Sequence, residues 1–255
     1  MDLGLGQKRI LVAGASRGLG AAIARAVAQE GARVALVARA SDDLQKVATE
    51  TGGIAVPADL STSAGPGEAA GNARDALGGL DGVVVNSGGP PTGTFDELDE
   101  ESWRRAIDGT LLAAIRLIRA TLPALREGRD PAIVILLSSS VREPVAGIVT
   151  SNVLRPGLNG LVKTLVGEIA PIRINGIAPG RFDTDRVRSL DTSRARELGV
   201  DVGEVQRTHL ARIPLGRYGM PEEVGRVGAF LLSTAASYVN GVVVLVDGGM
   251  IRSLP

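Results

Sequence analysis

The clearest binding motif in the sequence is the glycine-rich stretch AGASRGLG, which runs from Ala13 to Gly20. Gly14, Gly18 and Gly20 permit a tight turn and a close approach of ligand to backbone. The turn separates an apolar run from a helical pattern, so its amides would lie at the positive end of a helix dipole and bind a pyrophosphate. We therefore expect a dinucleotide site, although the spacing is G-x-x-x-G-x-G and not the commoner G-x-G-x-x-G.

A second position concerns the choice of dinucleotide. At the end of the second strand, a site for NAD normally places an acidic residue that binds the adenosine ribose. This chain has Ala38 followed by Arg39. Arg39 and Arg17 could hold a 2′-phosphate through bidentate hydrogen bonds, which favours NADP (NADPH) over NAD. The alternative is that Arg39 is only a solvated cation at the end of a strand.

These residues need a scaffold, and the sequence predicts one of alternating strands and helices. Short, nearly continuous apolar runs bounded by Gly, Asn or Asp are typical of parallel strands covered on both faces. Seven such runs occur, at residues 9–14, 33–39, 53–59, 82–89, 132–139, 173–180 and 242–249.

Helical periodicity appears between these runs, most clearly at residues 19–31, 101–128 and 221–237. The stretch 61–72 is rich in Gly and Ser, so we expect a flexible connection from a strand to a helix there. The pattern predicts an α/β fold with a single-domain Rossmann-type doubly wound sheet of about seven parallel strands flanked by helices. Residues 1–255 would form one NADP-binding domain.

The composition excludes several classes of function. The 28 basic and 28 acidic residues cancel, and aromatic residues make up only 2% of the chain, which argues against a nucleic-acid partner. Cysteine is absent, so disulfides and thiolate metal sites are excluded, and we expect no metal site. The first residues, MDLGLGQKRILVAG, have too few apolar residues after Lys8 and Arg9 for us to expect a signal peptide or a membrane span there. We expect a soluble cytoplasmic protein that does not bind membranes.

Several ordered motifs resemble those of the short-chain dehydrogenase/reductase family over nearly the whole chain. AGASRGLG is similar to the family's cofactor turn, NSGG at 86–89 to its N-N-A-G, and NGIAPGRFDT to its P-G-x-x-x-T, while residues 213–249 match its C-terminal part. Among relatives the chain is most similar to the β-ketoacyl-carrier-protein reductases. The resemblance implies these cofactor-binding residues: Gly14, Ser16, Arg17, Gly18, Leu19, Gly20, Arg39, Asp59, Leu60, Asn86, Gly88, Arg155, Pro179, Gly180 and Thr184.

The same resemblance implies further structure. Residues around 183–213 would form a lid over the substrate, and such lids carry specificity. The apolar segments 111–122 and 158–170 would pair between subunits, which implies a homotetramer, with a dimer as the alternative.

The catalytic residues of the resembled family are a serine, a tyrosine, a lysine and an asparagine, and only the first is present here. Ser138 aligns with the serine, although Ser139 and Ser140 are adjacent. Thr110 takes the place of the asparagine, while Ser151 and Arg155 take the places of the tyrosine and lysine. Lys163 lies two helical turns beyond Arg155, and we interpret it as a surface or interface residue.

The replacements weaken proton transfer, because an alkyl hydroxyl is a far weaker acid than a phenol and a guanidinium stays charged at any working pH. Two hypotheses follow. The first is an NADP(H)-dependent oxidoreductase acting on a carbonyl or alcohol, 3-oxoacyl-like by resemblance, whose proton comes from water, Ser138 or His209. The alternative is a catalytically silent nucleotide-binding sensor or scaffold, and His209 is then an ordinary surface residue. The halohydrin dehalogenases are a more distant resemblance, since they share Arg at the lysine position but keep the tyrosine and lack the nucleotide turn.

Overall fold

The computed structural model describes residues 2–253, and its centre is one parallel sheet with the strand order β3-β2-β1-β4-β5-β6-β7. All seven predicted strands are confirmed. Their bounds are β1 (Arg9–Ala13), β2 (Arg33–Ala38), β3 (Ile54–Pro57), β4 (Gly82–Val85), β5 (Ala132–Leu136), β6 (Arg173–Pro179) and β7 (Val243–Val246). The order reverses direction between β1 and β4, and ligands of such sheets bind where the carboxyl ends of these two strands diverge.

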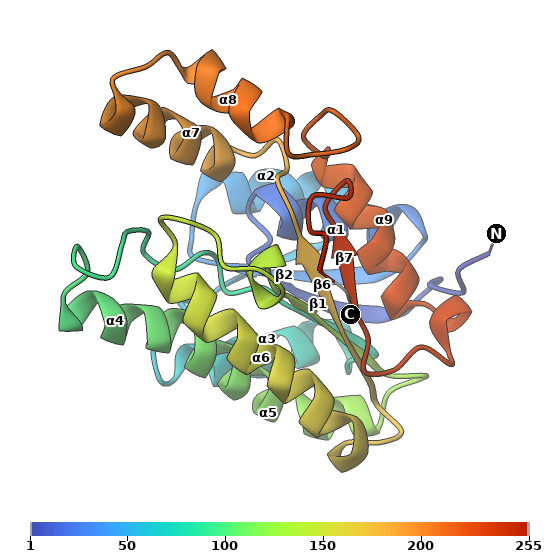
Figure 1. Ribbon diagram of the computed structural model, residues 1–255. Coiled ribbons are helices and arrows are strands. Elements are labelled where there is room, and N and C mark those ends of the chain that lie inside the picture. Colours follow the sequence, from blue (N-terminus) through green and yellow to red (C-terminus); the bar gives the residue numbers. More distant parts are fainter. Residues whose placement is uncertain (1, 254–255) are drawn as a thin grey trace.

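Helices cover both faces of the sheet (Figure 1). They are α1 (Gly18–Gln29), α2 (Asp42–Thr51), α3 (Gly65–Leu77), α4 (Glu100–Ala106), α5 (Ala113–Arg126), α6 (Val149–Glu168), α7 (Asp185–Leu198), α8 (Val202–Leu210) and α9 (Pro221–Leu232). Short 3₁₀ turns occupy η2 (Ser139–Val141) and η3 (Thr234–Ala236).

Alternating side chains of the strands separate the core into two layers. Leu11 and Ala13 of β1 pack with α3, α5 and α6, whereas Ile10 and Val12 pack with α1, α2 and α9. All four side chains are fully buried, as expected for a strand in the middle of a doubly covered sheet. The doubly wound architecture predicted from the sequence is therefore confirmed.

Close packing of α1 against α9 joins the two ends of the chain. A Cβ atom at Gly225 would lie 2.7 Å from the carbonyl oxygen of Ala22, and one at Gly228 would lie 2.9 Å from Cγ1 of Ile23. Only glycine lets the two helix backbones approach this closely.

The helix expected at 101–128 is interrupted. Between α4 and α5 the segment η1 (Ile107–Leu112) is a π-helix, whose wider turn accommodates an extra residue. Thr110 lies in this segment and is buried. Insertions of this kind occur often at functional sites.

Two other expectations need correction. The stretch 61–72 is helical from Gly65 onward, because Ala69, Ala70 and Ala73 of α3 are buried in the core and this packing outweighs the poor helix propensity of glycine. The helix predicted at 221–237 ends at Leu232 and is followed by a 3₁₀ turn.

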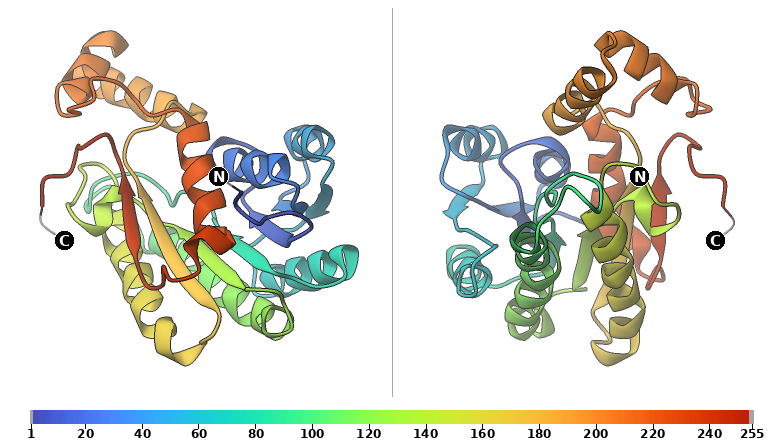
Figure 2. Two further views of the ribbon diagram at one scale, coloured as in Figure 1. Left: turned by 90° about the vertical axis from the view of Figure 1, so that its right-hand side faces the viewer. Right: turned by 60° about the vertical axis from the view of Figure 1, so that its left-hand side comes forward.

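Helices α7 and α8 stand together above the body of the molecule, beyond the carboxyl end of β6 (Figure 2). Helix α7 begins at Thr184, whose hydroxyl accepts a hydrogen bond from the amide of Val187, and it ends at Gly199 in the left-handed conformation. This pair of helices occupies most of the segment 183–213.

Within residues 2–253, no helix combines the length and the apolar character needed to cross a membrane. The same residues contain no group of three or more His, Asp or Glu side chains that could hold a metal ion.

Candidate cofactor and catalytic site

The glycine turn lies between β1 and α1, at the carboxyl edge of the sheet. A Cβ atom at Gly14 would lie 2.5 Å from Nδ2 of Asn86, and one at Gly20 would collide with the carbonyl oxygen of Gly14. Asn86, which follows β4, also donates a weak hydrogen bond of 3.4 Å to that carbonyl. The structure thus brings Gly14, Gly20 and Asn86 together into a compact turn.

The first turn of α1 is open to an anion. Helix α1 begins at Gly18, with Arg17 exposed at the N-cap, and its first turn contains no acidic residue. Ser16 and Leu19 flank Arg17 and are half-buried. The orphan amides of this turn and the helix dipole suit the phosphates of a dinucleotide.

A second group of predicted residues lies where β2 and β3 end. Arg39 is exposed directly after β2, and the amide of Ala58 donates to the carbonyl of Ala38, which holds the two strand ends together. Oδ1 of Asp59 accepts hydrogen bonds from the hydroxyl and amide of Ser61 at 2.7 and 2.9 Å. These bonds, together with the charge of Arg39, lower the pKa of Asp59. Leu60 is buried beside them.

The predicted residues at the end of β6 and just after it lie near the glycine turn between β1 and α1. Pro179 is buried in β6, and the amide of Gly180 donates to the carbonyl of Val246 in β7 at 2.9 Å. Cγ2 of Thr184 lies 3.9 Å from the position that a Cβ would take at Gly18. The start of α7 therefore adjoins the start of α1.

The serines at the end of β5 have different environments. Ser138 is half-buried, and its hydroxyl accepts the amide of Ser140 at 3.1 Å. Ser140 is buried, and its hydroxyl lies 3.3 Å from that of Ser151 on α6. Of the three adjacent serines, Ser138 is the one that solvent reaches. The hydroxyl of Ser151 lies near another hydroxyl, that of Ser140, and not near a more acidic group of the described residues.

Arg155 lies one turn after Ser151 on α6 and is only 7% exposed. Its Nη1 donates to the carbonyl of Leu136 and its Nη2 donates to that of Gly88 at 3.0 Å, while its Nε is buried without a partner among the described residues. Burial and the nearby charge of Arg186 lower the pKa of Arg155 to about 10. The guanidinium is therefore still charged at neutral pH.

Arg186 was missed by the sequence analysis. It lies in the first turn of α7, and its Nη2 donates to the carbonyl of Pro90 at 3.0 Å. Its guanidinium occupies the space in which Gly89 would place a Cβ atom. Nothing in the sequence pattern indicates that a residue so distant along the chain contacts Gly89.

Neither tyrosine replaces the missing phenol. Tyr238 is fully exposed, whereas the hydroxyl of Tyr218 donates to Asp191 at 2.9 Å. Burial and this hydrogen bond raise the pKa of Tyr218 to about 12, so it is a poor proton donor.

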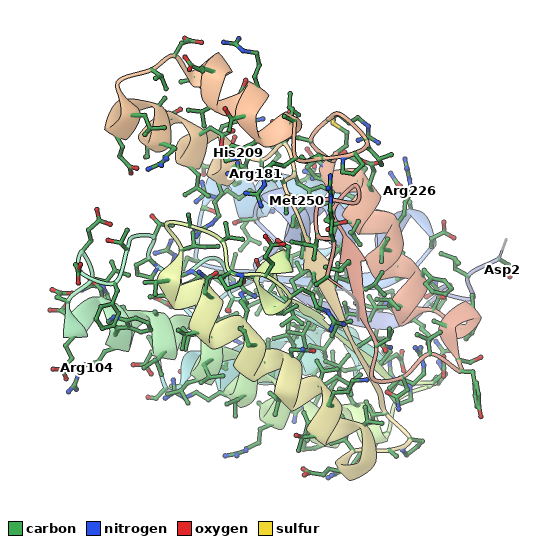
Figure 3. All side chains as sticks on the ribbon, viewed as in Figure 1. Asp2, Arg104, Arg181, His209, Arg226 and Met250 are labelled. Carbon is green, nitrogen blue, oxygen red and sulfur yellow. The ribbon has the colours of Figure 1, made fainter. Side chains whose placement is uncertain are left out.

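Asp191, in the middle of α7, is the centre of a partly buried cluster of polar side chains. It is fully buried, and its Oδ1 accepts from Nη1 of Arg181 at 2.7 Å. Nε2 of His209 lies 3.6 Å from the same oxygen, and Figure 3 shows His209 close to Arg181. Burial and the charge of Arg181 lower the pKa of His209. His209 is thus half-buried in this cluster, not an ordinary surface side chain, whereas Lys163 is exposed as predicted.

The arrangement fits a nicotinamide dinucleotide. The turn around Gly14 offers backbone amides and glycine at positions 14, 18 and 20, the end of β2 offers Arg39, and the segments after β4 and β6 offer Asn86 and Thr184. These residues form a continuous edge that a long anionic ligand can follow. The site also offers hydroxyls and a buried cation at the end of β5, but no phenol within the described residues.

Comparison with known proteins gives the same assignment over nearly the whole chain. A family model described as "Enoyl-(Acyl carrier protein) reductase" matches residues 14–251. The oxidoreductase UcpA of Salmonella typhimurium is 35% identical over 252 residues, which cover 95% of this chain and 94% of that protein. A protein of Xanthobacter autotrophicus described as inactive 2-(S)-hydroxypropyl-CoM dehydrogenase 2 is 36% identical over 244 residues, covering 89% and 99%.

A solved structure is similarly close. The L-sorbose reductase of Gluconobacter frateurii, crystallised with NADPH and L-sorbose, has a TM-score of 0.93 and 32% sequence identity, with all of both chains covered.

Proposed function

Because the chain belongs to the short-chain dehydrogenase/reductase family, we propose that it is an NADP(H)-dependent oxidoreductase acting on a carbonyl or alcohol. The observation that carries the proposal is the compact turn formed by Gly14, Gly20 and Asn86 at the start of α1, whose free amides suit the phosphates of a dinucleotide. When bound, the nicotinamide supplies or accepts a hydride. The protein binds and orients both reactants.

The preference for NADP rests on charge at the adenosine end. Arg39 and Arg17 are both exposed near the ends of β1 and β2, and Ala38 offers no carboxylate that would repel a 2′-phosphate. The resolved structure of L-sorbose reductase contains NADPH, which supports the same choice. Asp59 is the proposed adenine contact, together with Leu60.

Ser138 is the proposed contact for the reacting oxygen, because it is the solvent-accessible serine at the end of β5. Arg155 places a positive charge at the ends of β4 and β5, where it donates to the carbonyls of Gly88 and Leu136, and this charge can stabilise a developing oxyanion or bind ribose hydroxyls. Ser151 and Thr110 provide only weakly acidic hydroxyls, so proton delivery to the oxygen is the weak step. Absence of a positioned acid typically costs about 10²–10⁴ in rate.

The silent nucleotide-binding alternative must still be distinguished, since one similar protein is described as inactive. The family assignment and the L-sorbose reductase structure favour the oxidoreductase. A 3-oxoacyl-like substrate remains the prediction made by resemblance.

Three further features are part of the proposal. The chain forms one nucleotide-binding domain, with residues 183–213 as a substrate lid. It assembles as a homotetramer, which light scattering would check, and a monomer at micromolar concentration would contradict it. A cytoplasmic location also stays a prediction.

The deciding experiment combines calorimetry with a turnover assay. The purified protein is titrated with NADPH and with NADH, and a panel of 3-oxoacyl thioesters, ketoses and simple ketones is then tested for NADPH oxidation. We expect tight NADPH binding and slow but measurable turnover with at least one carbonyl. Tight NADPH binding without turnover on the whole panel would favour the silent binder, and the absence of dinucleotide binding would refute both.

A further inference from the structure

Apart from Arg155, most of the buried or half-buried arginines in the described part of the chain are paired with carboxylates; Arg142 is half-buried and forms no such pair there. Buried cations are costly unless they are paired, so pairing is the expected arrangement. The pairs are Arg9 with Asp81 at 2.8 Å, Arg25 with Glu50 at 2.7 Å, Arg116 with Asp108 at 3.3 Å, Arg173 with Asp130 at 3.8 Å, and Arg181 with Asp191 at 2.7 Å.

Arg155 and Arg186 depart from this arrangement. Neither forms an ion pair with a carboxylate of residues 2–253; both contact the segment after β4, Arg155 at Gly88 and Arg186 at Pro90, and the like charge of Arg186 acts on Arg155. Arg186 is exposed along much of its length, but its guanidinium packs against Gly89, and this desolvation lowers its pKa. Two cations therefore lie close together with no described anion to balance them.

Backbone carbonyls do not supply that balance. Arg155 donates to Leu136 and Gly88 and Arg186 donates to Pro90, so all three acceptors are neutral groups. Nε of Arg155 remains buried and without a partner in the described residues. The Nε atoms of Arg142 and Arg173 are unpaired in the same way, so the distinguishing feature of Arg155 is the neighbouring like charge, which an anionic group would offset.

The position of the pair indicates which ligand brings that group. The glycine turn that suits a pyrophosphate lies on the β1 side of β4, where Asn86 meets Gly14. Arg155 comes from α6 and reaches the end of β5, on the opposite side of β4 and next to the serines. Arg186 comes from the first turn of α7, at the base of the proposed lid.

We propose that Arg155 and Arg186 form a binding site for an anionic group of the substrate, a carboxylate or a similar oxyanion carried close to the reacting carbonyl. The inference rests on the proposed function only in taking the ligand to be a substrate. The anion site itself can be tested without turnover. It defines the substrate class as acidic carbonyl compounds or their alcohols.

The first test uses sulfate, an anion that cannot react and makes no demand on substrate shape. The NADP⁺-saturated protein is titrated calorimetrically with sulfate at constant ionic strength. Arg186→Gln should weaken sulfate binding by about tenfold or more, the size of a lost charge-assisted hydrogen bond. Arg188→Gln is the matched control: it removes the same charge two residues away, from a side chain already paired with Asp183 and Asp185. Its sulfate affinity should equal that of the wild type.

A second pair of variants addresses Arg155. Arg155→Lys keeps the positive charge and should retain more sulfate affinity than Arg155→Gln, whereas a purely structural role would make both variants equal to each other in sulfate binding. Loss of sulfate affinity in Arg188→Gln as well as in Arg186→Gln would show a diffuse electrostatic effect and overturn the proposal. So would unchanged sulfate affinity in Arg186→Gln.

The third comparison distinguishes substrate from cofactor as the source of the anion. Acetoacetate and methyl acetoacetate present the same ketone with and without a carboxylate. We expect the NADP⁺-loaded wild type to bind acetoacetate about tenfold more tightly than the ester, and Arg186→Gln to abolish this preference. If Arg186→Gln instead lowers NADP⁺ affinity and leaves the preference unchanged, the pair serves the cofactor phosphates and the proposal is wrong. If the protein reduces both ketones but shows no preference for acetoacetate over its ester, the proposed anion site is refuted. The oxidoreductase assignment is then unaffected.

Discussion

A tyrosine and a lysine introduced at positions 151 and 155 should convert a weak site into an efficient one. Ser151 is buried and its hydroxyl lies 3.3 Å from that of Ser140, so it presents no acid to a substrate. The double variant Ser151→Tyr with Arg155→Lys supplies a phenol and an adjacent ammonium that lowers the phenol's pKa. Both residues would project from the same face of α6, one turn apart.

The expected gain follows from the contribution of a positioned general acid. Such a group typically contributes about 10²–10⁴ in rate, which corresponds to roughly 2.7–5.4 kcal/mol of activation free energy. The ring must enter a site that is only 6% exposed, and overpacking costs about 1–3 kcal/mol of the free energy of unfolding. Domains are stable by about 5–15 kcal/mol, so the variant should remain folded.

The assay compares the rate of NADPH oxidation with a neutral ketone, together with the midpoint of thermal unfolding. Ser151→Phe with Arg155→Lys is the control, because it adds the same ring without the hydroxyl. We expect kcat of the tyrosine variant to exceed those of the control and the wild type by at least about 100-fold. Equal rates for the tyrosine and phenylalanine variants, both folded and both binding NADPH, would show that position 151 does not face the reacting oxygen. A wild type as fast as the tyrosine variant would show that the chain has its own proton donor.

Three other changes test separate parts of the structure. Arg39→Asp should reduce or reverse the preference for NADPH over NADH in calorimetry, and equal affinities in the wild type would contradict the charge argument. Asp81→Asn should destabilise the fold by about 2 kcal/mol in urea unfolding, because bonds from Arg9 and an amide hold the pKa of the fully buried Asp81 at about 2. Since that pKa is lowered from 3.8, the stabilisation is present above about pH 4 and disappears as the pH falls towards 2, and the variant should lack this pH dependence. Asp191→Asn should raise KM for the carbonyl more than it weakens NADPH binding, because it loosens the attachment of α7 to Arg181; an unchanged KM would show that α7 does not contact the substrate.

The strands and the cofactor turn were predictable from the sequence because their signals are local. A continuous apolar run such as that of β5 must be buried on both faces, and the three glycines at positions 14, 18 and 20 lie within one short stretch between a strand pattern and a helix pattern. Helix α3 was not predicted, because its glycines have low helix propensity and the helix is stabilised by burial of its alanines in the core.

The long-range contacts of this site were not predictable. Ser140 meets Ser151 across the space between β5 and α6, and Arg186 reaches Gly89 from a helix formed almost a hundred residues later. Such contacts depend on the assembled fold and leave no periodic pattern in the sequence. The cluster around Asp191 is a further example, since its members come from three separate segments.

The packing of α1 against α9 has a consequence for biosynthesis. The strand, turn and helix that would receive the dinucleotide are synthesised long before Gly225 and Gly228, on which α1 packs. Until then Ile23 and its neighbours on α1 expose their apolar side to water. A nascent chain stalled before Pro221 should therefore be captured by chaperones and not by NADPH. Cofactor binding would then require that α9 has been synthesised and has packed on α1.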